Sequence, residues 1–61
     1  MSQRDEVQRL FGQWERDEIE KYEFYAATAK YNVHLVAQVT GISRVVIQDR
    51  RRYLRQLAAM K

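Results

Sequence analysis

Cysteine and proline are absent from this 61-residue sequence, and it contains only two glycines and one histidine. Without cysteine the chain can form neither a disulfide scaffold nor a thiolate zinc site, and one histidine cannot assemble another metal centre. A chain of this length buries only about 60% of its unfolded surface, so it has room for a single domain, residues 1–61. We therefore expect its stability to come from apolar packing, supplemented by self-association.

Long hydrophobic runs are also missing. No stretch approaches the roughly 20 apolar residues that a membrane span requires, and the first residues lack the basic start and apolar stretch of a secretory signal. The common phosphate-binding, dinucleotide-binding, metalloprotease and serine-nucleophile motifs do not occur. We therefore expect an intracellular protein that is not an enzyme, with no membrane partner, cofactor, metal or small-molecule substrate.

Charge is divided unevenly between the two halves of the chain. Residues 1–33 carry five basic and seven acidic side chains, a net charge of −2, whereas residues 34–61 carry six basic side chains and one acidic, a net charge of +5. A basic half of this kind commonly meets phosphate or anionic lipid. The pattern predicts an acidic scaffold that supports a basic working surface.

The apolar residues of the N-terminal half recur at helical spacing. Four of them form the first stripe: Val7, Leu10, Phe11 and Trp14. The pattern predicts a helical scaffold over residues 1–31, either as one long helix or as two short helices that meet near residues 12–15. The surplus of aromatic residues has two interpretations, because these side chains can face a second subunit or wrap around their own small core.

Residues 34–55 read HLVAQVTGISRVVIQDRRRYLR, and their spacing is that of a helix-turn-helix. Gly41 supplies the turn, Ala37 is small where two helices approach closely, and Ser43 is placed to cap the second helix. Three apolar side chains are expected to lock the two helices together: Val36, Ile42 and Ile47.

The fold expected from these signals is all-α. Asn32 is a competent N-cap for the first helix of the motif. We predict a small helical bundle that contains a helix-turn-helix over residues 33–60, with a long C-terminal recognition helix from about Ser43 to near Met60.

The run AQVTGISR, residues 37–44, resembles the helix-turn-helix family of DNA-binding proteins, especially bacterial and phage repressors. The resemblance implies that the second helix lies in the major groove, with base-reading positions at Arg44, Val45 and Gln48. Arginine can bind guanine and glutamine can bind adenine bidentately, and valine can contact the thymine methyl group. The sequence departs from the family at Arg50, where an apolar residue is usual.

A weaker resemblance covers residues 45–55, VVIQDRRRYLR, which are similar to the end of the homeodomain recognition helix. That family carries tryptophan at the position of Val46 and asparagine at the position of Asp49. Both families place this helix in the major groove, so both resemblances imply the same kind of partner, double-stranded DNA.

At about 100° per residue the second helix is amphipathic. Its polar side holds four arginines and a glutamine: Arg44, Gln48, Arg51, Arg52 and Arg55. Its apolar side is expected to face the core: Val46, Ile47, Tyr53, Leu54 and Leu57. Beyond its first turns the helix leaves the groove floor, so we expect phosphate contacts from Arg51, Arg52 and Arg55, together with Ser43. His34 is a further candidate, although a lone histidine is more often an ordinary surface residue.

Arg50 lies at the centre of the apolar side, where an unpaired guanidinium is costly. We expect it either to extend into solvent along its stem or to pair with an acid of the N-terminal helices. The candidate acids are Glu18, Glu20 and Glu23. Asp49 is expected to pair with a neighbouring arginine rather than to read cytosine.

The function expected from these features is sequence-specific binding of duplex DNA, by a small transcriptional repressor or a phage or plasmid accessory factor. A homodimer is expected, joined either by the face over residues 7–14 or by the tail that carries Tyr53, Leu57 and Met60. The competing interpretation is a protein-interaction module whose basic helix docks on an acidic partner. RNA binding is a weaker third interpretation.

Overall fold

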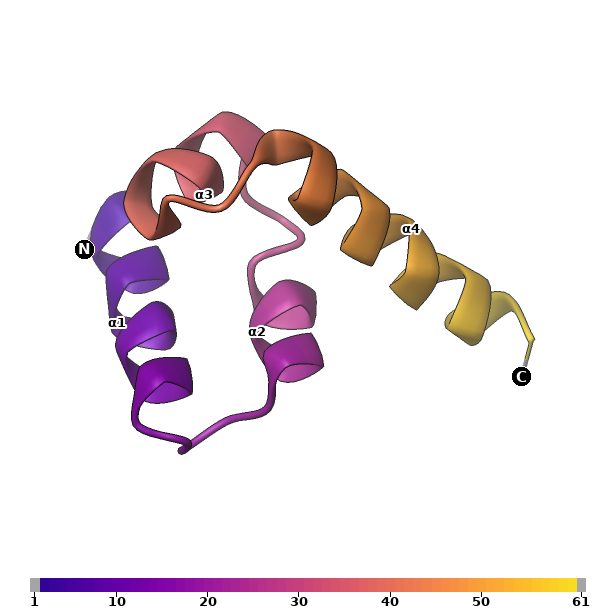
Figure 1. The fold of residues 1–61 in the computed structure, drawn as a ribbon, viewed down its shortest axis with the longest axis horizontal. Helices are drawn as coiled ribbons and strands as arrows, with labels where there is room; N and C mark the ends of the chain where they lie inside the picture. Colours follow the sequence, from indigo (N-terminus) through magenta and orange to yellow (C-terminus); the bar gives the residue numbers. More distant parts are fainter. Residues whose placement is uncertain (1, 61) are drawn as a thin grey trace.

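A computed structural model describes residues 2–60, and this part of the chain forms four α-helices joined by short turns (Figure 1). The helices are α1 (Gln3–Glu15), α2 (Lys21–Ala27), α3 (Val33–Thr40) and α4 (Arg44–Ala59). The predicted all-α fold is therefore confirmed. None of these helices is both long and apolar enough to cross a membrane.

The N-terminal scaffold consists of two helices, as in the second of the two predicted alternatives, but they are joined through residues 16–20 and do not meet near residues 12–15 as predicted. Gly12 is an interior residue of α1, which ends at Glu15, and α2 begins at Lys21. Asp17 adopts the left-handed conformation, with φ 60°. The backbone N–H of Glu18 donates to Gln13 O at 2.8 Å, a bond of the kind that closes many helix C-termini. Glycine usually occupies this left-handed position after a helix, but here the residue is Asp17. A search of the sequence for glycine therefore does not find the end of α1.

The ends of α3 are closed as predicted, by the side chain of Asn32 at its start and by the backbone of Gly41 at its end. The Oδ1 atom of Asn32 accepts from His34 N at 2.7 Å at the start of α3. At its end Gly41 has φ 76°, a left-handed conformation that glycine adopts without a steric penalty. Its N–H donates to Ala37 O at 2.8 Å, which satisfies a terminal carbonyl.

Two hydroxyl groups shape the turn into α4. Thr40 Oγ1 donates to Val36 O at 2.8 Å and accepts from Ile42 N at 3.1 Å, so it ties the turn back to the preceding helix. Ser43 Oγ accepts from Val45 N at 3.2 Å and caps α4, which confirms its predicted role. Three residues therefore separate two helices whose facing ends are both held in place.

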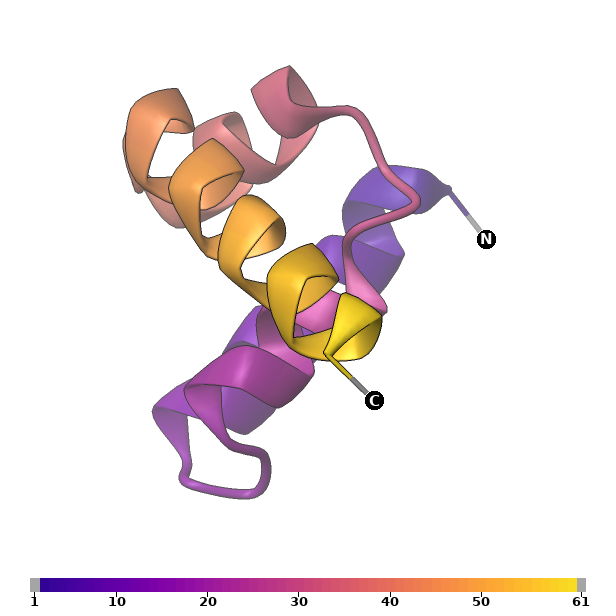
Figure 2. The same cartoon turned by 90° about the vertical axis from the view of Figure 1, so that its right-hand side faces the viewer.

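The four helices form a closed ring of contacts around one core. The first helix, α1, packs against α2 and α3, and α4 packs against the same two helices from the other side. In the turned view of Figure 2, α3 lies above and α1 with α2 below, while α4 runs between them nearest the viewer. Each helix contributes to the core, whose buried apolar residues are Val7, Leu10, Phe24, Tyr25, Val36 and Ile47.

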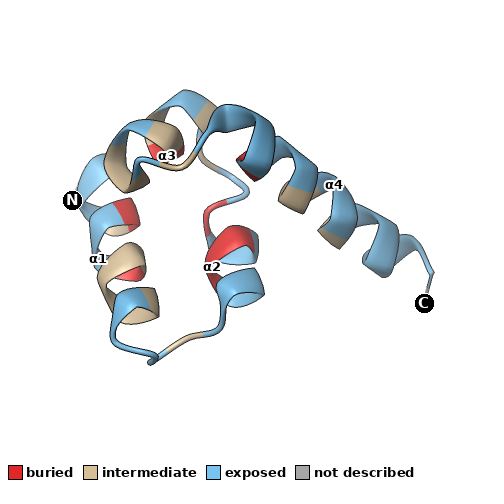
Figure 3. Ribbon diagram, viewed as in Figure 1, coloured by how far each residue is buried: buried red, intermediate tan, exposed pale blue. Residues whose placement is uncertain are grey.

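The aromatic residues of α1 and α2 wrap around their own core. The ring of Trp14 lies 5.2 Å from Phe24 and 5.9 Å from Tyr25, between ring centroids. Val7 is fully buried. Of the face over residues 7–14, one of the two surfaces expected to join a dimer, Val7 and Leu10 are buried and Phe11 and Trp14 are half-buried against the monomer's own core (Figure 3).

The outer part of α4 extends beyond the body of the protein (Figures 1 and 3). Ile47 is buried and Leu54 half-buried, as predicted, but other members of the predicted core side are not covered. Val46 is 38% exposed, Tyr53 43% and Leu57 40%, because the short α2 covers only the neighbouring stripe of α4. With Met60, these side chains form an exposed apolar strip, which we call the α4 seam: Val46, Tyr53, Leu57 and Met60.

Candidate nucleic-acid interface

The predicted reading face lies along α4 and is largely open to solvent. Arg44, Val45 and Gln48 are all exposed, and Val45 is 73% exposed. Further along the same helix, Arg52 and Arg55 are exposed as well. The exposed residues of this helix that lie beside α2 form what we call the basic edge of α4: Gln48, Arg52 and Arg55.

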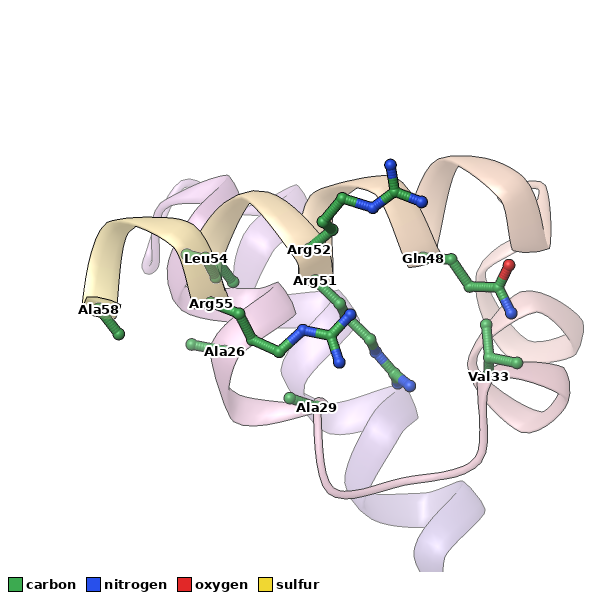
Figure 4. Close-up of a pocket in the computed structure, with 9 residues that line it drawn as sticks. All are labelled: Ala26, Ala29, Val33, Gln48, Arg51, Arg52, Leu54, Arg55 and Ala58. Carbon is green, nitrogen blue, oxygen red and sulfur yellow. The ribbon is translucent and has the colours of Figure 1, made fainter. Parts of the chain in front are cut away.

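This basic edge borders a groove of about 650 Å³ between α4 and the end of α2. The groove has a floor of small apolar side chains under a polar rim, and its lining residues are Ala26, Ala29, Val33, Gln48, Arg51, Arg52, Leu54, Arg55 and Ala58. Figure 4 shows Arg51 and Arg55 reaching from α4 toward the α2 side, whereas Arg52 points away from the groove. Arg52 is therefore the arginine best placed to meet a partner lying outside the groove.

Arg51 differs from the other arginines of this face because its guanidinium is already engaged. Its Nη2 atom donates to Thr28 O and to Tyr31 O, each at 2.9 Å. Burial lowers the pKa of Arg51, although an arginine remains charged in proteins. The cation sits at the carboxyl end of α2, where the helix dipole favours it. Arg51 was expected to bind phosphate, and here it fastens α4 to the end of α2.

Arg50 does not pair with an acid of the N-terminal helices, so that prediction is wrong. Its Nη1 atom lies 3.1 Å from Asp49 Oδ2, the neighbour in sequence, while its Nε is buried without a hydrogen-bond partner. The proposed partners are engaged elsewhere, since Glu18 pairs with Arg16 at 2.6 Å and Glu23 accepts from a backbone N–H at the start of α2. The predicted pairing of Asp49 with a neighbouring arginine is confirmed.

The first turn of α4 faces a second hollow, of about 550 Å³, on the α3 side of the helix. Its lining consists of His34, Ala37, Gln38, Ile42, Ser43 and Arg44. Arg44 Nη1 lies 3.3 Å from His34 Nδ1 and 3.4 Å from Nε2. The structure therefore divides the predicted site residues between two surfaces, with Ser43 and Arg44 beside α3 and Gln48, Arg52 and Arg55 beside α2.

The residues given a structural role all lie at the junction of α3 and α4. Ile47 is fully buried, and Ala37 and Ile42 are half-buried against the same core. Gly41 is exposed, and a Cβ built on it meets no atom within 4 Å, so its left-handed backbone rather than lack of space favours glycine. These residues hold the reading face in place without contributing to it.

One polar residue of the second hollow, Gln38, was not singled out from the sequence, and neither was Arg4, which contacts it. Gln38 accepts at Oε1 from Arg4 Nη2, at 3.0 Å, which brings a cation of α1 to the edge of the hollow. No local pattern links residues 34 positions apart. The sequence carries only a weak indication of this hollow. The first turns of α3 and α4 contain no acidic residue, although helix N-termini favour one.

Comparison with known proteins returns no relative. No protein-family model matches the chain, and no curated protein or solved structure matches it significantly. Residues 2–60 contain no group of three or more histidine or acidic side chains that could hold a metal ion. The site is therefore interpreted from its own geometry and charge.

Proposed function

We propose that this protein binds double-stranded DNA in a sequence-specific manner, with α4 in the major groove. The observation that carries the proposal is the open basic edge of α4, presented behind a three-residue turn whose two helix ends are capped. An α-helix fits the major groove, where exposed arginine and glutamine side chains can bind base edges bidentately. A chain this small would act by occupying its site, as a transcriptional repressor or a phage or plasmid accessory factor.

The exposed side chains of α4 divide into two roles. Arg44, Val45 and Gln48 lie in its first turns, from which a helix of this type reads bases. Arg52 and Arg55 lie one to two turns further on and are assigned to phosphates. Phosphate contacts supply affinity that depends on salt and carries little sequence information. Arg51 is left out of the phosphate set because it holds the end of α2.

The test is a fluorescence-anisotropy titration with a duplex selected from a randomised pool and with a scrambled duplex, over a series of salt concentrations. Gln48→Ala should reduce the preference for the selected duplex by about 1–3 kcal/mol, with little change in the salt slope. Arg52→Gln should weaken both duplexes equally and reduce the slope of log K against log salt by about 0.9.

Arg16→Gln is the matched control for Arg52→Gln. It removes the same charge from the turn between α1 and α2, at the opposite end of the body from the basic edge of α4 (Figure 1). Its duplex affinity should stay close to that of the parent protein. Equal losses of duplex affinity in the two variants would show that net charge alone drives the interaction. Failure of the parent protein to bind duplex DNA at low salt would refute the proposal.

We further propose that the protein works as a homodimer joined through the α4 seam. Tyr53, Leu57 and Met60 follow one another at spacings of four and three residues, and Val46 lies seven residues before Tyr53. This is the pattern of a helix-pairing stripe, interrupted at one position by Arg50. Tyr22 extends this apolar surface, because its ring lies 5.2 Å from that of Tyr53. A dimer would double the phosphate contacts and place its half-sites about 34–36 Å apart on DNA.

Sedimentation equilibrium tests the dimer. Leu57→Glu places a charge in the seam and should give a folded monomer with reduced affinity for a palindromic duplex. Gln56→Glu adds the same charge one residue away from the seam and should leave the dimer intact. A parent protein that sediments as a monomer at all concentrations would exclude this arrangement.

A second candidate function is supported by the groove beside α2. Its alanine-rich floor beside arginines suits an acidic amphipathic helix, with apolar side chains facing the floor and carboxylates facing Arg55. In that case duplex DNA would bind weakly and without sequence preference, while an acidic helical peptide would bind tightly. Titration of both partners against the same protein sample distinguishes the two functions.

A further inference from the structure

The groove between α4 and the end of α2 has the length and width of a trough for a third helix. Along α4 it runs from Gln48 to Ala58, ten positions apart, which is about 15 Å of helix. The groove is therefore long enough for nearly three turns of a partner helix. A helix that lies in it contacts α4 on one side and the end of α2 on the other, which is how grooves between helices hold amphipathic helices.

The floor of this groove is apolar and consists mainly of short side chains: Ala26, Ala29, Val33, Leu54 and Ala58. The three alanines are exposed, so the backbone of a partner helix can come close to them. The sugar-phosphate backbone of DNA would leave this floor without an apolar partner. The leucines of an amphipathic helix would remove it from water.

One cation of the groove is directed into it and has no partner of its own. Arg55 is exposed, makes no hydrogen bond among residues 2–60 and reaches from α4 toward the α2 side (Figure 4). No carboxylate is among the residues that line the groove. A carboxylate supplied by the partner can bind the Arg55 guanidinium through two parallel hydrogen bonds. The groove therefore suits a helix that is apolar on one face and acidic beside it.

The two walls of the groove are joined before any partner binds. Arg51 lines the groove, and its Nη2 atom donates to Thr28 O and to Tyr31 O at 2.9 Å each. These bonds hold α4 against the end of α2. A site that is already formed loses less free energy to ordering when its partner arrives.

We infer that this groove binds an acidic amphipathic helix of a partner protein, and that this helix displaces DNA from α4. Gln48 is assigned to base reading and Arg55 to phosphate, and both line the groove. A helix that covers Gln48 and pairs with Arg55 withdraws both side chains from DNA. The protein therefore binds one partner or the other. The inference rests on the proposed function, because it requires that DNA use the same two side chains.

This exclusion differs from the second candidate function, in which the acidic helix is the only tight partner. Here duplex and helix both bind tightly, but not at the same time. The groove then acts as a regulatory site, through which a partner protein releases the chain from its DNA.

Competition between a duplex and a model peptide tests the exclusion. The probe is a peptide of about four helical turns with leucines on one face and glutamates on the other. Its control contains the same residues in an order that forms no apolar face. In fluorescence anisotropy at constant ionic strength, the probe at about ten times its own Kd should weaken binding of the selected duplex about tenfold. A complex that contains protein, duplex and probe together, or equal displacement by the control peptide, would overturn the inference.

Two alanine variants locate the peptide on the groove. Ala26→Gln places a longer polar side chain on the floor without changing the charge. It should weaken binding of the probe about fivefold or more and leave duplex affinity unchanged. Ala27→Gln is the matched control, because the neighbouring residue does not line the groove, and it should leave both affinities unchanged. Probe affinity that is unchanged in Ala26→Gln, in a variant that circular dichroism shows to be folded, would overturn the inference.

Two arginine variants separate the side chain shared by both partners from one used by DNA alone. Arg55→Gln should weaken the probe and the duplex. Arg52→Gln removes the same charge, but its guanidinium points away from the groove, so it should weaken the duplex alone (Figure 4). Equal losses of probe affinity in the two variants would show that net charge rather than the groove binds the peptide.

Failure of the inference and failure of the proposed function give different results. Binding of the probe without binding of duplex DNA would keep the groove as a docking site and refute the proposed function. Binding of duplex DNA that the probe does not weaken would remove the inference and leave the proposed function intact.

Discussion

Replacing Arg51 with methionine separates the structural role of this residue from the phosphate role expected of it. The substitution removes the guanidinium and keeps most of the aliphatic stem. Two hydrogen bonds of 2.9 Å, to Thr28 O and Tyr31 O, are lost with it. Both acceptors lie just beyond the carboxyl end of α2, where orphan carbonyls and the helix dipole favour a cation. The contact between α2 and α4 should therefore weaken.

The size of the effect follows from these two bonds. Hydrogen bonds to a charged group contribute about 1.5–3 kcal/mol each. The sum is reduced here, because Arg51 is only partly buried, Thr28 O still accepts from Tyr31 N at 3.0 Å, and the buried Nε of Arg51 has no partner to lose. We expect a net loss of about 1–3 kcal/mol, a large part of the ~3–5 kcal/mol that a core of this size usually supplies.

Urea and thermal unfolding measure this loss, and Arg52→Met is the control. Arg52 is the next residue on the same helix, is exposed and makes no hydrogen bond among residues 2–60, so its replacement should change stability by less than about 0.5 kcal/mol. For Arg51→Met the midpoint should fall by about 4–8 °C per kcal/mol lost. In duplex binding the order of the two variants should reverse, so that Arg52→Met binds DNA more weakly than Arg51→Met. Equal stability of the two variants would refute the structural role of Arg51.

Three further substitutions test the fold. Asp17→Gly should stabilise the protein by about 0.5–1 kcal/mol in urea unfolding, because glycine adopts the left-handed conformation more easily; a loss of stability would contradict the role assigned to this turn. Ile47→Ala should cost about 2–5 kcal/mol and leave the domain largely unfolded by circular dichroism, whereas Val45→Ala, on the exposed face, should unfold like the parent protein. Burial raises the pKa of Tyr25 above its usual value of about 10, so Tyr25 ionises more easily in the unfolded state. Its contribution to the free energy of unfolding is therefore fully present below about pH 10 and is lost as pH rises through the pKa of the folded state. In Tyr25→Phe this part of the alkaline decline should disappear from unfolding curves measured between about pH 9 and about pH 11, and an unchanged decline would show that another group is responsible.

Local signals predicted the helical elements because each end of a helix is closed by residues adjacent in the chain. Asn32 and Ser43 could be assigned as caps, and Gly41 as the turn, from side-chain chemistry and backbone freedom alone. The same signals failed between α1 and α2, because an aspartate, Asp17, occupies the left-handed position that glycine usually takes. The meeting point predicted near residues 12–15 therefore lies inside α1.

The contacts of the arginines could not be derived from helical periodicity. On a helical wheel Arg51 and Arg52 share one polar face, yet the structure places the first against the carbonyls at the end of α2 and leaves the second free. The difference arises because α2 ends beside Arg51, a contact between residues 20 or more positions apart in the sequence. In the same way Arg50 found its partner in Asp49, because the acids expected to pair with it had closer partners.

The sequence by itself determined the helical class, the turn at Gly41 and the concentration of basic residues on one face of the last helix, since all of these arise from interactions within a few residues. Only the tertiary structure decided which apolar residues are covered. It buried Val7 and Leu10 and half-buried Phe11 and Trp14. It left the α4 seam exposed, because α2 is too short to cover the whole apolar side of α4. It also brought Arg44 against His34 and Arg4 against Gln38, through packing that no local pattern records.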